Sequence, residues 1–377
     1  MIREFAPYLA AHGVSVHAAT GDSPNSLPEG VESHRQVSGL LQLGPSCRGI
    51  GRIIAKRDID LVHVHDVDNV DCIQELVARV PVLLHLHNYS YWCPGGELFY
   101  SAQEKRCPLE LGWKCIPNAY HKRCNNRQPK RLIDSMRKTK KRMELFEEDV
   151  RFLVSSSFLK RRASDRGISR DKIHVVPYAI DGARMDGRST SRVRRFDPGF
   201  VLFVGRLTPS KGVSHLIRAF AGVPEGVGEQ LVIAGDGHSR SEIQECVVES
   251  GVEARTKMVG WCENEELSWL YDNCSMVVMP SLWDEVFGIV GLEAMAAKKP
   301  VVAYDVGGIS QWLVDGKTGV LVEPGDVEAL RRQIERLLKA PDVLDRMGRN
   351  GYSHFQNEFT VQEHAKALVS VYENILE

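Results

Sequence analysis

Two carboxylates eight residues apart, Glu285 and Glu293, flank a Phe287-Gly288 turn in the second half of the chain. A helix that begins near this turn places Glu285 in the preceding loop and Glu293 about two turns along, so both can face one ligand across the helix start. Unpaired amides at a helix N-terminus bind anions, and carboxylates accept hydrogen bonds from vicinal hydroxyls such as those of a ribose or hexose. Spacing alone is more typical of solvated helix residues, but the Gly-Gly pair that begins at Gly307, after the next apolar run, favours a binding site.

A second group of candidate residues follows the apolar run Val201–Gly205, where Arg206 and Lys211 lie five residues apart and Gly212 comes next. Glycine lets the backbone approach a ligand closely. Arginine binds phosphate through two parallel hydrogen bonds, and lysine supplies a point charge. A lone pair of cations is usually a solvated basic loop, but this position directly after a strand favours neutralisation of a diphosphate leaving group.

The elements that must position these residues are short apolar runs alternating with helical stretches. Most of the runs are continuous rather than alternating, which is typical of strands buried on both faces in parallel sheets. The pattern therefore predicts right-handed βαβ units and an α/β fold with doubly wound sheets. The predicted strands are Leu61–His65, Val82–His87, Phe152–Ser155, Ile173–Pro177, Val201–Gly205, Leu231–Gly235, Lys257–Gly260, Met276–Pro280, Val301–Tyr304 and Val320–Val322.

The 377 residues are long enough for more than one core. The polar segment Asp181–Gly199 predicts a linker between two Rossmann-like domains, residues 1–195 and 196–355, with a C-terminal helix over 356–377 packing back toward the first domain. The chain opens on a helix-like stretch, Ile2–His12, and then a strand, Val14–Ala19, whereas a doubly wound domain normally begins with a strand. We therefore expect the first strand of the N-terminal domain to be missing, through a misplaced start rather than a true loss.

The motifs Gly205-Arg-Leu, Lys211-Gly and Glu285-x-Phe-Gly-x4-Glu-Ala-Met-Ala resemble those of the retaining glycosyltransferases of family 4, also described as glycosyl transferases group 1. The resemblance covers nearly the whole chain and is most specific over residues 200–326. It implies the GT-B fold, in which two Rossmann-like domains face each other across a cleft and the C-terminal domain binds a nucleotide sugar.

Matching positions imply roles for individual residues of the second domain. Arg206 and Lys211 would contact the diphosphate, and Glu293 would contact the ribose. Glu285, together with the amides of Phe287, Gly288 and Ile289, would face the donor sugar and the phosphates, and Gly260 and Trp261 would lie near the base.

The resemblance also implies a histidine of the N-terminal domain near the transferred sugar, and His87 matches that place. The family usually has His-Asp there, whereas this chain has His87-Asn88, which counts against a role for a neighbouring carboxylate. Three further histidines, His63, His65 and His85, line the same predicted strands, and we expect each to be a satisfied structural side chain.

Retaining transfer by front-face attack is the implied reaction, with the cations and helix amides stabilising the leaving phosphate. The implied donor is a UDP- or GDP-linked sugar, and the implied acceptor is a glycan or lipid-linked molecule of polysaccharide or glycoconjugate biosynthesis. We expect no cofactor and no metal, because Arg206, Lys211 and the helix N-terminus take the place of Mg²⁺. Two alternatives stay open: a truncated pseudoenzyme that binds nucleotide sugar without turnover, and a GT-B epimerase or phosphorylase.

Charge is distributed unevenly along the chain. Residues 1–195 hold 32 Lys/Arg and 22 Asp/Glu, whereas residues 196–377 hold 16 and 27. Ten Lys/Arg and a single acid, Asp134, fall within residues 122–142, which predicts either a membrane face near anionic lipid or a solvated helix face. No nucleic-acid motif accompanies the charge. Without a signal peptide or a long apolar run, we expect a cytoplasmic protein, peripheral at the inner face of the plasma membrane.

Four of the nine cysteines, Cys93, Cys107, Cys115 and Cys124, crowd the predicted insertion over residues 93–142. Their spacing lacks the Cys-x-x-Cys pairs typical of zinc sites. Free thiols are therefore favoured over a structural metal, and disulfides come third. We expect all nine cysteines to be reduced.

Overall fold

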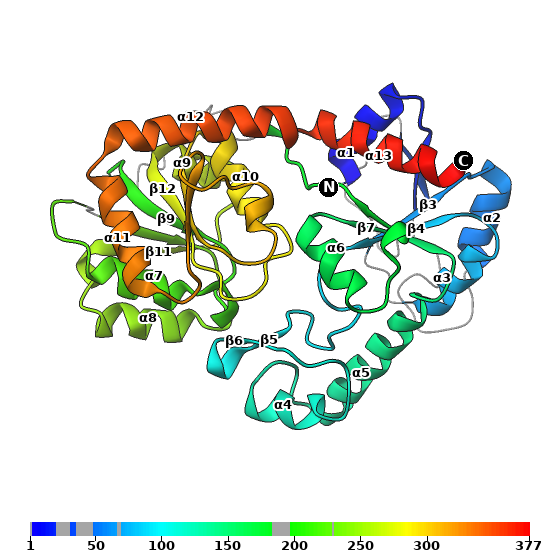
Figure 1. The fold of residues 1–377 in the computed structure, drawn as a ribbon, viewed down its shortest axis with the longest axis horizontal. Helices are drawn as coiled ribbons and strands as arrows, with labels where there is room; N and C mark the ends of the chain where they lie inside the picture. The colour runs from blue at the N-terminus through cyan, green and yellow to red at the C-terminus, as the bar shows by residue number, and fades with distance from the viewer. Residues whose placement is uncertain (1, 20–30, 35–47, 66–68, 183–196, 228–229) are drawn as a thin grey trace. The chain divides into compact units, whose positions relative to one another are not determined.

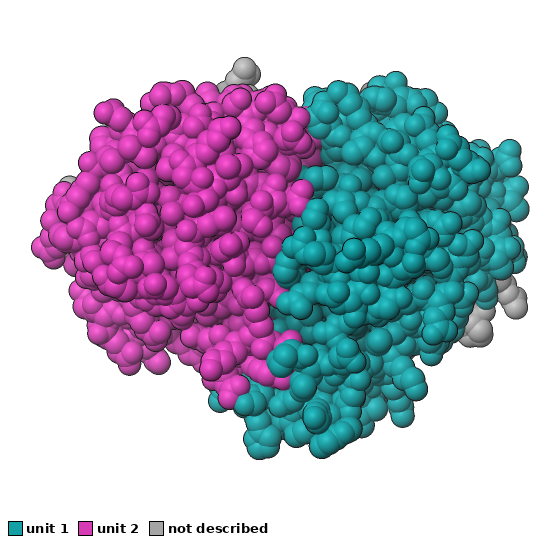
Figure 2. All heavy atoms as spheres, in the orientation of Figure 1, with its two compact units in different colours: residues 1–98, 108–178, 361–377 teal, residues 99–107, 179–360 magenta. Residues whose placement is uncertain are grey.

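The computed structural model describes residues 2–19, 31–34, 48–65, 69–182, 197–227 and 230–377. The chain divides into two compact units, shown in different colours in Figure 2. Unit 1 comprises residues 1–98, 108–178 and 361–377, and unit 2 comprises residues 99–107 and 179–360. Most of the predicted linker Asp181–Gly199 lies outside the described residues.

Unit 2 is built on a parallel sheet of six strands among the described residues, in the order β11-β10-β9-β12-β13-β14. Apart from the edge strand β11, the strands are mostly buried, which explains their continuous apolar sequence, so this part of the predicted fold is confirmed. Their bounds are β9 Phe200–Val204, β10 Leu231–Ala234, β11 Thr256–Gly260, β12 Cys274–Met279, β13 Val301–Tyr304 and β14 Gly319–Val322.

Helices cover both faces of this sheet, as Figure 1 shows. Helices α7 (Val213–Ala221), α8 (Arg240–Glu249) and α11 (Val327–Leu338) pack together on one side, and α9 (Asn264–Asn273) and α10 (Ile289–Ala296) lie on the other. The long helix α12 (Pro341–Glu358) packs on α10. This is the doubly wound arrangement expected of strand–helix alternation.

A short hairpin from the first half of the sequence also belongs to unit 2. It consists of β5 (Phe99–Tyr100), the 3₁₀ turn η1 (Ser101–Gln103) and β6 (Lys105–Arg106), paired antiparallel. The turn η1 contacts a second 3₁₀ turn, η4 (Pro209–Lys211), which lies between β9 and α7. The hairpin therefore packs against the loop that carries Lys211.

Unit 1 contains a parallel sheet whose described strands follow the order β3-β4-β7-β8, and a separate parallel pair of β1 and β2. The strand bounds are β1 Val16–Ala19, β2 Val31–His34, β3 Val62–His65, β4 Val82–Leu86, β7 Val150–Val154 and β8 Ile173–Val175. The helix bounds are α1 Ile2–Ala11, α2 Arg48–Arg57, α3 Val70–Val77, α4 Cys115–His121, α5 Pro129–Glu144, α6 Ser157–Ser164 and α13 Val361–Leu376. The predicted helix at the start of the chain and the strand after it are both present.

The last helix, α13, packs against the first, α1, within unit 1. Their shared core contains Phe5 and Leu9 of α1 and Ala365 and Leu368 of α13, in contact with buried strand residues such as Leu83. Each end of the chain is therefore held by the burial of an apolar helix face. Within the described part of the chain, no helix combines the length and apolar character needed to cross a membrane.

Candidate functional site

The candidate site of unit 2 lies where the strand order of the sheet reverses. Strands β9 and β12 are neighbours at the centre of the sheet, and the chain continues from β9 toward one edge and from β12 toward the other. In open parallel sheets, ligands bind at this switch point, outside the carboxyl ends of the strands. The loop after β9 carries Arg206 and Lys211, and the loop after β12 carries Glu285, so the topology places both predicted groups at the same edge.

Lys211 and Glu285 form an ion pair across these two loops. The Lys211 Nζ atom lies 2.6 Å from Glu285 Oε1, and the hydroxyl of Ser281 donates to the same oxygen at 2.6 Å. Glu285 is 4% exposed. The ammonium of Lys211 also lies 5.1 Å from the centre of the Trp283 ring, an arrangement that favours a cation. The structure thus joins two residues that the sequence separates by 74 positions.

The pKa of Glu285 reflects two opposing effects. Burial raises the pKa, but the charge of Lys211 and the hydrogen bonds from Lys211 and Ser281 outweigh burial and hold the pKa below its ordinary value. Glu285 is therefore a carboxylate at neutral pH.

Two glycines allow these loops to touch. Gly212 has a φ of +64°, and a Cβ there would lie 1.9 Å from the carbonyl oxygen of Pro280, at the end of β12. Gly307 has a φ of +61°, and a Cβ there would lie 2.1 Å from the carbonyl oxygen of Glu285. The amide of Gly308 donates to that same oxygen at 2.6 Å. The Lys-Gly and Gly-Gly motifs therefore fix the backbone on both sides of the ion pair.

Helix α10 begins at Ile289, next to the ion pair, as the sequence predicts. Its N-cap is Gly288, with a φ of +99° that suits glycine. The indole of Trp312 donates to the carbonyl oxygen of Phe287 at 2.7 Å and so anchors the turn before the helix. A Cβ on Gly291 would lie 2.1 Å from the Trp312 ring, so this glycine is needed for the indole to pack there. The start of α10 is thus rigidly supported, as an anion site requires.

Glu293 lies one turn further along α10 and is bound to a neighbouring helix. The hydroxyl of Tyr271, which is fully buried on α9, donates to Glu293 Oε2 at 2.6 Å. Burial raises the pKa of Glu293, and the hydrogen bond from Tyr271 partly offsets this effect. Tyr271 fixes Oε2 of Glu293, so the contact with ribose that the sequence predicts would involve Oε1.

The remaining predicted residues of unit 2 lie on neighbouring loops. Arg206 is exposed, directly after β9. Gly260 ends β11 with a φ of +81°, and Trp261 is 70% exposed beside it. An exposed indole next to a bent strand end is suited to stacking on a base. The backbone of the β9 and β10 loops is in close contact, because a Cβ on Gly235 would lie 1.8 Å from the Gly205 oxygen.

The sequence did not reveal the contribution of the hairpin formed by β5 and β6. Arg106 Nε lies 3.0 Å from Oδ1 of the buried Asp284, the residue before Glu285. Glu104 accepts from the ring of His215 on α7 at 3.3 Å, and this hydrogen bond is the main reason that the pKa of Glu104 is lowered. A segment in the predicted cysteine-rich insertion therefore supports the loop of the candidate site. The only signal in the sequence is a Glu-Lys-Arg run in an otherwise unremarkable stretch.

His87 directly follows β4 in unit 1, at the end of the predicted strand. Its Nδ1 atom lies 2.6 Å from the hydroxyl of Tyr178, and its Nε2 atom lies 2.9 Å from Nδ1 of His65. The ring of His87 stacks on that of His85, with centroids 4.0 Å apart. The expectation that His85 is a satisfied structural side chain is wrong, because neither ring nitrogen has a partner among the described residues.

The cysteines of the predicted insertion differ from Cys72 in their bonding. Cys93, Cys107, Cys115 and Cys124 form no disulfide bonds, and within the described parts of the chain they form no group of three or more metal-binding side chains. Cys72 is disulfide-bonded, so the expectation that all nine are reduced is wrong for this residue.

Most of the basic residues of 122–142 lie on α5, whose buried side is marked by Leu132 and Thr139.

Two α/β units with parallel, doubly wound sheets define the GT-B class of glycosyltransferase folds. Two solved structures share this fold across nearly the whole chain. One is Anabaena Alr3699/HepE in complex with UDP-glucose, with a TM-score of 0.69 and 18% identity over 99% of this chain and 96% of that one. The other is sucrose-phosphate synthase from Thermosynechococcus elongatus, with a TM-score of 0.69 and 22% identity over 99% and 92%.

Sequence profiles of two families match the two parts of the chain. "Glycosyltransferase Family 4" matches residues 1–184, and "Glycosyl transferases group 1" matches residues 190–354. The chain belongs to the family 4 glycosyltransferases. The alpha-D-kanosaminyltransferase of Streptomyces kanamyceticus is 33% identical over 225 residues, which is 58% of this chain and 57% of that protein. The chain thus matches little more than half the length of this curated relative.

Proposed function

We propose that the protein is a retaining glycosyltransferase that moves a hexosyl group from a nucleotide sugar to a glycan or lipid-linked acceptor, in the biosynthesis of a polysaccharide or glycoconjugate. The observation that carries the proposal is the Lys211–Glu285 ion pair, which joins the loops after β9 and β12 at the point where the strand order reverses. A cation, a carboxylate and helix amides at one edge suit a donor that combines a diphosphate with a hydroxylated sugar.

Donor binding follows from the chemistry of each group. Lys211 and Arg206 neutralise the diphosphate, and the amides at Gly288 and Ile289 donate to its oxygens. In this proposal, Oε1 of Glu293 accepts from a ribose hydroxyl, while Trp261 stacks on the base. The donor is a UDP- or GDP-linked sugar, and the UDP and UDP-glucose bound to Anabaena Alr3699/HepE support UDP as the first nucleotide to test.

The transfer step is a front-face displacement. The acceptor hydroxyl oxygen forms a bond to the anomeric carbon as the bond from that carbon to the phosphate oxygen breaks. The bonding electron pair stays on the phosphate, which also takes the proton of the acceptor. The charge that develops there lies against Lys211, Arg206 and the α10 amides, which are preorganised to stabilise it. These groups supply the stabilisation that Mg²⁺ provides elsewhere, so the proposed transfer needs no metal.

The acceptor is proposed to bind to unit 1. His87 directly follows β4, and its ring is oriented by Tyr178 and His65, so a hydrogen bond to a sugar hydroxyl would replace one of these two partners. The basic helix α5 exposes Lys130, Arg137 and Lys140, and we assign it to anionic lipid at the inner face of the plasma membrane.

Binding and turnover can be tested separately. A thermal-shift screen of UDP- and GDP-sugars identifies the donor, and nuclear magnetic resonance of the product reports its anomeric configuration. We expect Lys211→Ala and Glu293→Ala to lower turnover by at least ~100-fold, which is typical when a group aimed at developing charge or at the donor is removed. The matched controls are Lys317→Ala and Glu245→Gln, at exposed positions of unit 2.

Three results would contradict parts of the proposal. Wild-type turnover in both site variants would remove the site assignment. An inverted anomeric product would exclude front-face displacement. Tight binding of a nucleotide sugar without transfer to any acceptor would favour a non-catalytic binding protein.

A further inference from the structure

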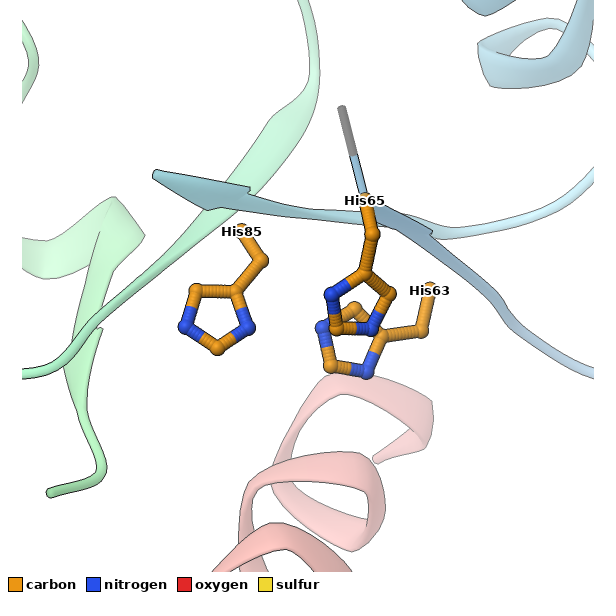
Figure 3. Close-up of side chains that lie close together, drawn as sticks. All are labelled: His63, His65 and His85. Atoms are coloured by element: carbon orange, nitrogen blue, oxygen red, sulfur yellow. The ribbon is translucent and has the colours of Figure 1, made fainter. Parts of the chain in front are cut away.

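Four histidines of unit 1 form two His-x-His pairs on adjacent parallel strands. His63 and His65 lie on β3. His85 lies on β4, and His87 is the first residue after β4. The register places His65 directly opposite His85. Because alternate residues of a strand point to the same face, all four rings project to one side of the sheet. Figure 3 shows His63, His65 and His85 gathered there, on the side of helix α13.

Some ring nitrogens of these histidines have hydrogen-bond partners, and others lack one among the described residues. His63 Nδ1 lies 2.8 Å from the hydroxyl of Tyr372 on α13, and His65 Nδ1 lies 2.9 Å from His87 Nε2. His85 is 1% exposed, yet both of its nitrogens lack a partner among the described residues, and so does the buried Nε2 of His63. A buried polar atom without a hydrogen-bond partner destabilises the folded state. Two histidines with three such atoms on one face indicate that a ligand completes the cluster.

We propose that His63, His65 and His85 bind one divalent transition-metal ion of the zinc type. One nitrogen from each ring lies within 4.8 Å of the others, and this is the only group of three or more potential metal ligands that meets this limit in the described part of the chain. Imidazole nitrogens are preferred ligands of Zn²⁺, and a His-x-His pair with a third histidine from the next strand supplies three on one face.

The hydrogen bonds around the cluster prepare the right nitrogens for the metal. With its proton on Nδ1, His63 donates to the hydroxyl oxygen of Tyr372, and its Nε2 keeps a free lone pair. His65 does the same by donating from Nδ1 to Nε2 of His87. Metal-bound histidines usually donate their second N–H to such a partner, which fixes the tautomer and the ring orientation.

Binding requires a modest contraction of the cluster. Nitrogen ligands of tetrahedral zinc lie about 3.4 Å apart, given Zn–N bonds of about 2.0–2.1 Å. Because the three nitrogens lie within 4.8 Å of one another, they must approach by at most about 1.4 Å. Rotation of partly exposed side chains supplies this, and His63 and His65 are only partly buried. Three protein ligands leave a fourth position of the metal for water or another small ligand.

The test is metal binding by the full chain, measured by equilibrium dialysis against Zn²⁺ after chelator treatment. We expect one ion per chain, and we expect His63→Gln and His65→Gln each to weaken binding by at least ~100-fold, since each removes a direct ligand. The control His121→Gln changes an exposed histidine, and Cys93→Ser with Cys124→Ser removes alternative thiol ligands. Both controls should bind Zn²⁺ as the unmodified protein does.

Co²⁺ in place of Zn²⁺ gives an independent readout of the ligands. We expect visible absorption typical of tetrahedral nitrogen ligation, without thiolate charge-transfer bands, and we expect it to vanish in His65→Gln. The metal-free variants should retain the circular dichroism and melting temperature of the metal-free parent. A parent protein that binds no stoichiometric Zn²⁺, or binding that survives in both histidine variants, would overturn the proposal.

Discussion

Replacing Lys211 with methionine should destabilise unit 2 because it leaves a buried carboxylate without its cation. Methionine keeps most of the length and apolar stem of the lysine, so packing changes little. Glu285 stays 4% exposed and keeps its hydrogen bond from Ser281. The change therefore isolates the electrostatic contribution of the ion pair.

The expected magnitude follows from the burial of the two side chains. Removing one partner of a buried pair costs about 3–5 kcal/mol. The lysine side chain is 19% exposed, and Ser281 still donates to the carboxylate, so the lower end applies. We expect a loss of about 3 kcal/mol in the free energy of unfolding at pH 7.5. The double variant Lys211→Met with Glu285→Gln removes both charges and should recover most of this loss.

The pH dependence has a definite sign. In the unmodified protein, the pKa of Glu285 is below its unfolded value, so its contribution is present at neutral pH and is lost as pH falls through the folded pKa. In Lys211→Met, burial dominates and the folded pKa lies above the unfolded value of about 4.3. Folding then becomes less favourable as pH rises. The difference in stability between the two proteins should grow from pH 4.5 to pH 8.

Urea unfolding of the parent, both single variants and the double variant measures the coupling directly. Fluorescence of Trp283 and Trp312 reports on unit 2, since both indoles lie in or beside the site loops. A coupling energy near zero would refute the reasoning. So would a stability difference between Lys211→Met and the parent that does not change with pH.

Three further predictions concern other parts of the site and the surface. Gly307→Ala should lower the free energy of unfolding, measured with urea, by at least ~3 kcal/mol. The new Cβ would lie 2.1 Å from the Glu285 carbonyl oxygen, at a backbone φ of +61°. The control is Gly316→Ala, where φ is +71° but no atom lies close to the new Cβ. Tyr271→Phe removes the hydrogen bond that partly offsets the effect of burial on Glu293, so the pKa of Glu293 should rise further. The free energy of unfolding should fall by about 1–3 kcal/mol, and the decrease should be larger at pH 8 than at pH 5. The exposed basic residues of α5 should bind anionic vesicles in a salt-dependent manner, with about 1 kcal/mol lost for each Lys or Arg changed to Gln; equal binding to neutral vesicles in a sedimentation assay would contradict the membrane assignment.

Strand positions were predictable because burial on both faces leaves a continuous apolar sequence. The runs at 201–205, 231–235 and 301–304 correspond to β9, β10 and β13 within one residue at each end. The start of α10 was predictable for a different reason, since the Phe-Gly turn before it requires a positive φ at Gly288. Both signals are local, so a single sequence contains them.

Side-chain partners were not predictable in the same way. The sequence predicts that Glu285 and Lys211 serve one ligand, but not that they bind each other, because that contact depends on the approach of two loops at Gly212 and Gly307. Tyr271, the partner of Glu293, lies on a different helix with ordinary neighbours in the sequence. The unsatisfied nitrogens of His85 depend on which strand lies beside β3, which the sequence does not specify.

The hairpin over residues 99–107 shows how non-local contacts change the meaning of a domain boundary. A division of the sequence near residue 195 assigns this segment to the first domain, yet its contacts place it in unit 2. Its cation Arg106 pairs with Asp284, which precedes Glu285, and Glu104 pairs with His215 at the start of α7. Asp284 directly precedes Glu285, and His215 follows Lys211 in the sequence. Residues from the first, basic half of the sequence therefore contact the neighbours of the Lys211–Glu285 pair in the second, acidic half. The two halves of the sequence differ in net charge, but they are not identical to the two units of the fold. The hairpin belongs to the basic half of the sequence and to unit 2 of the structure.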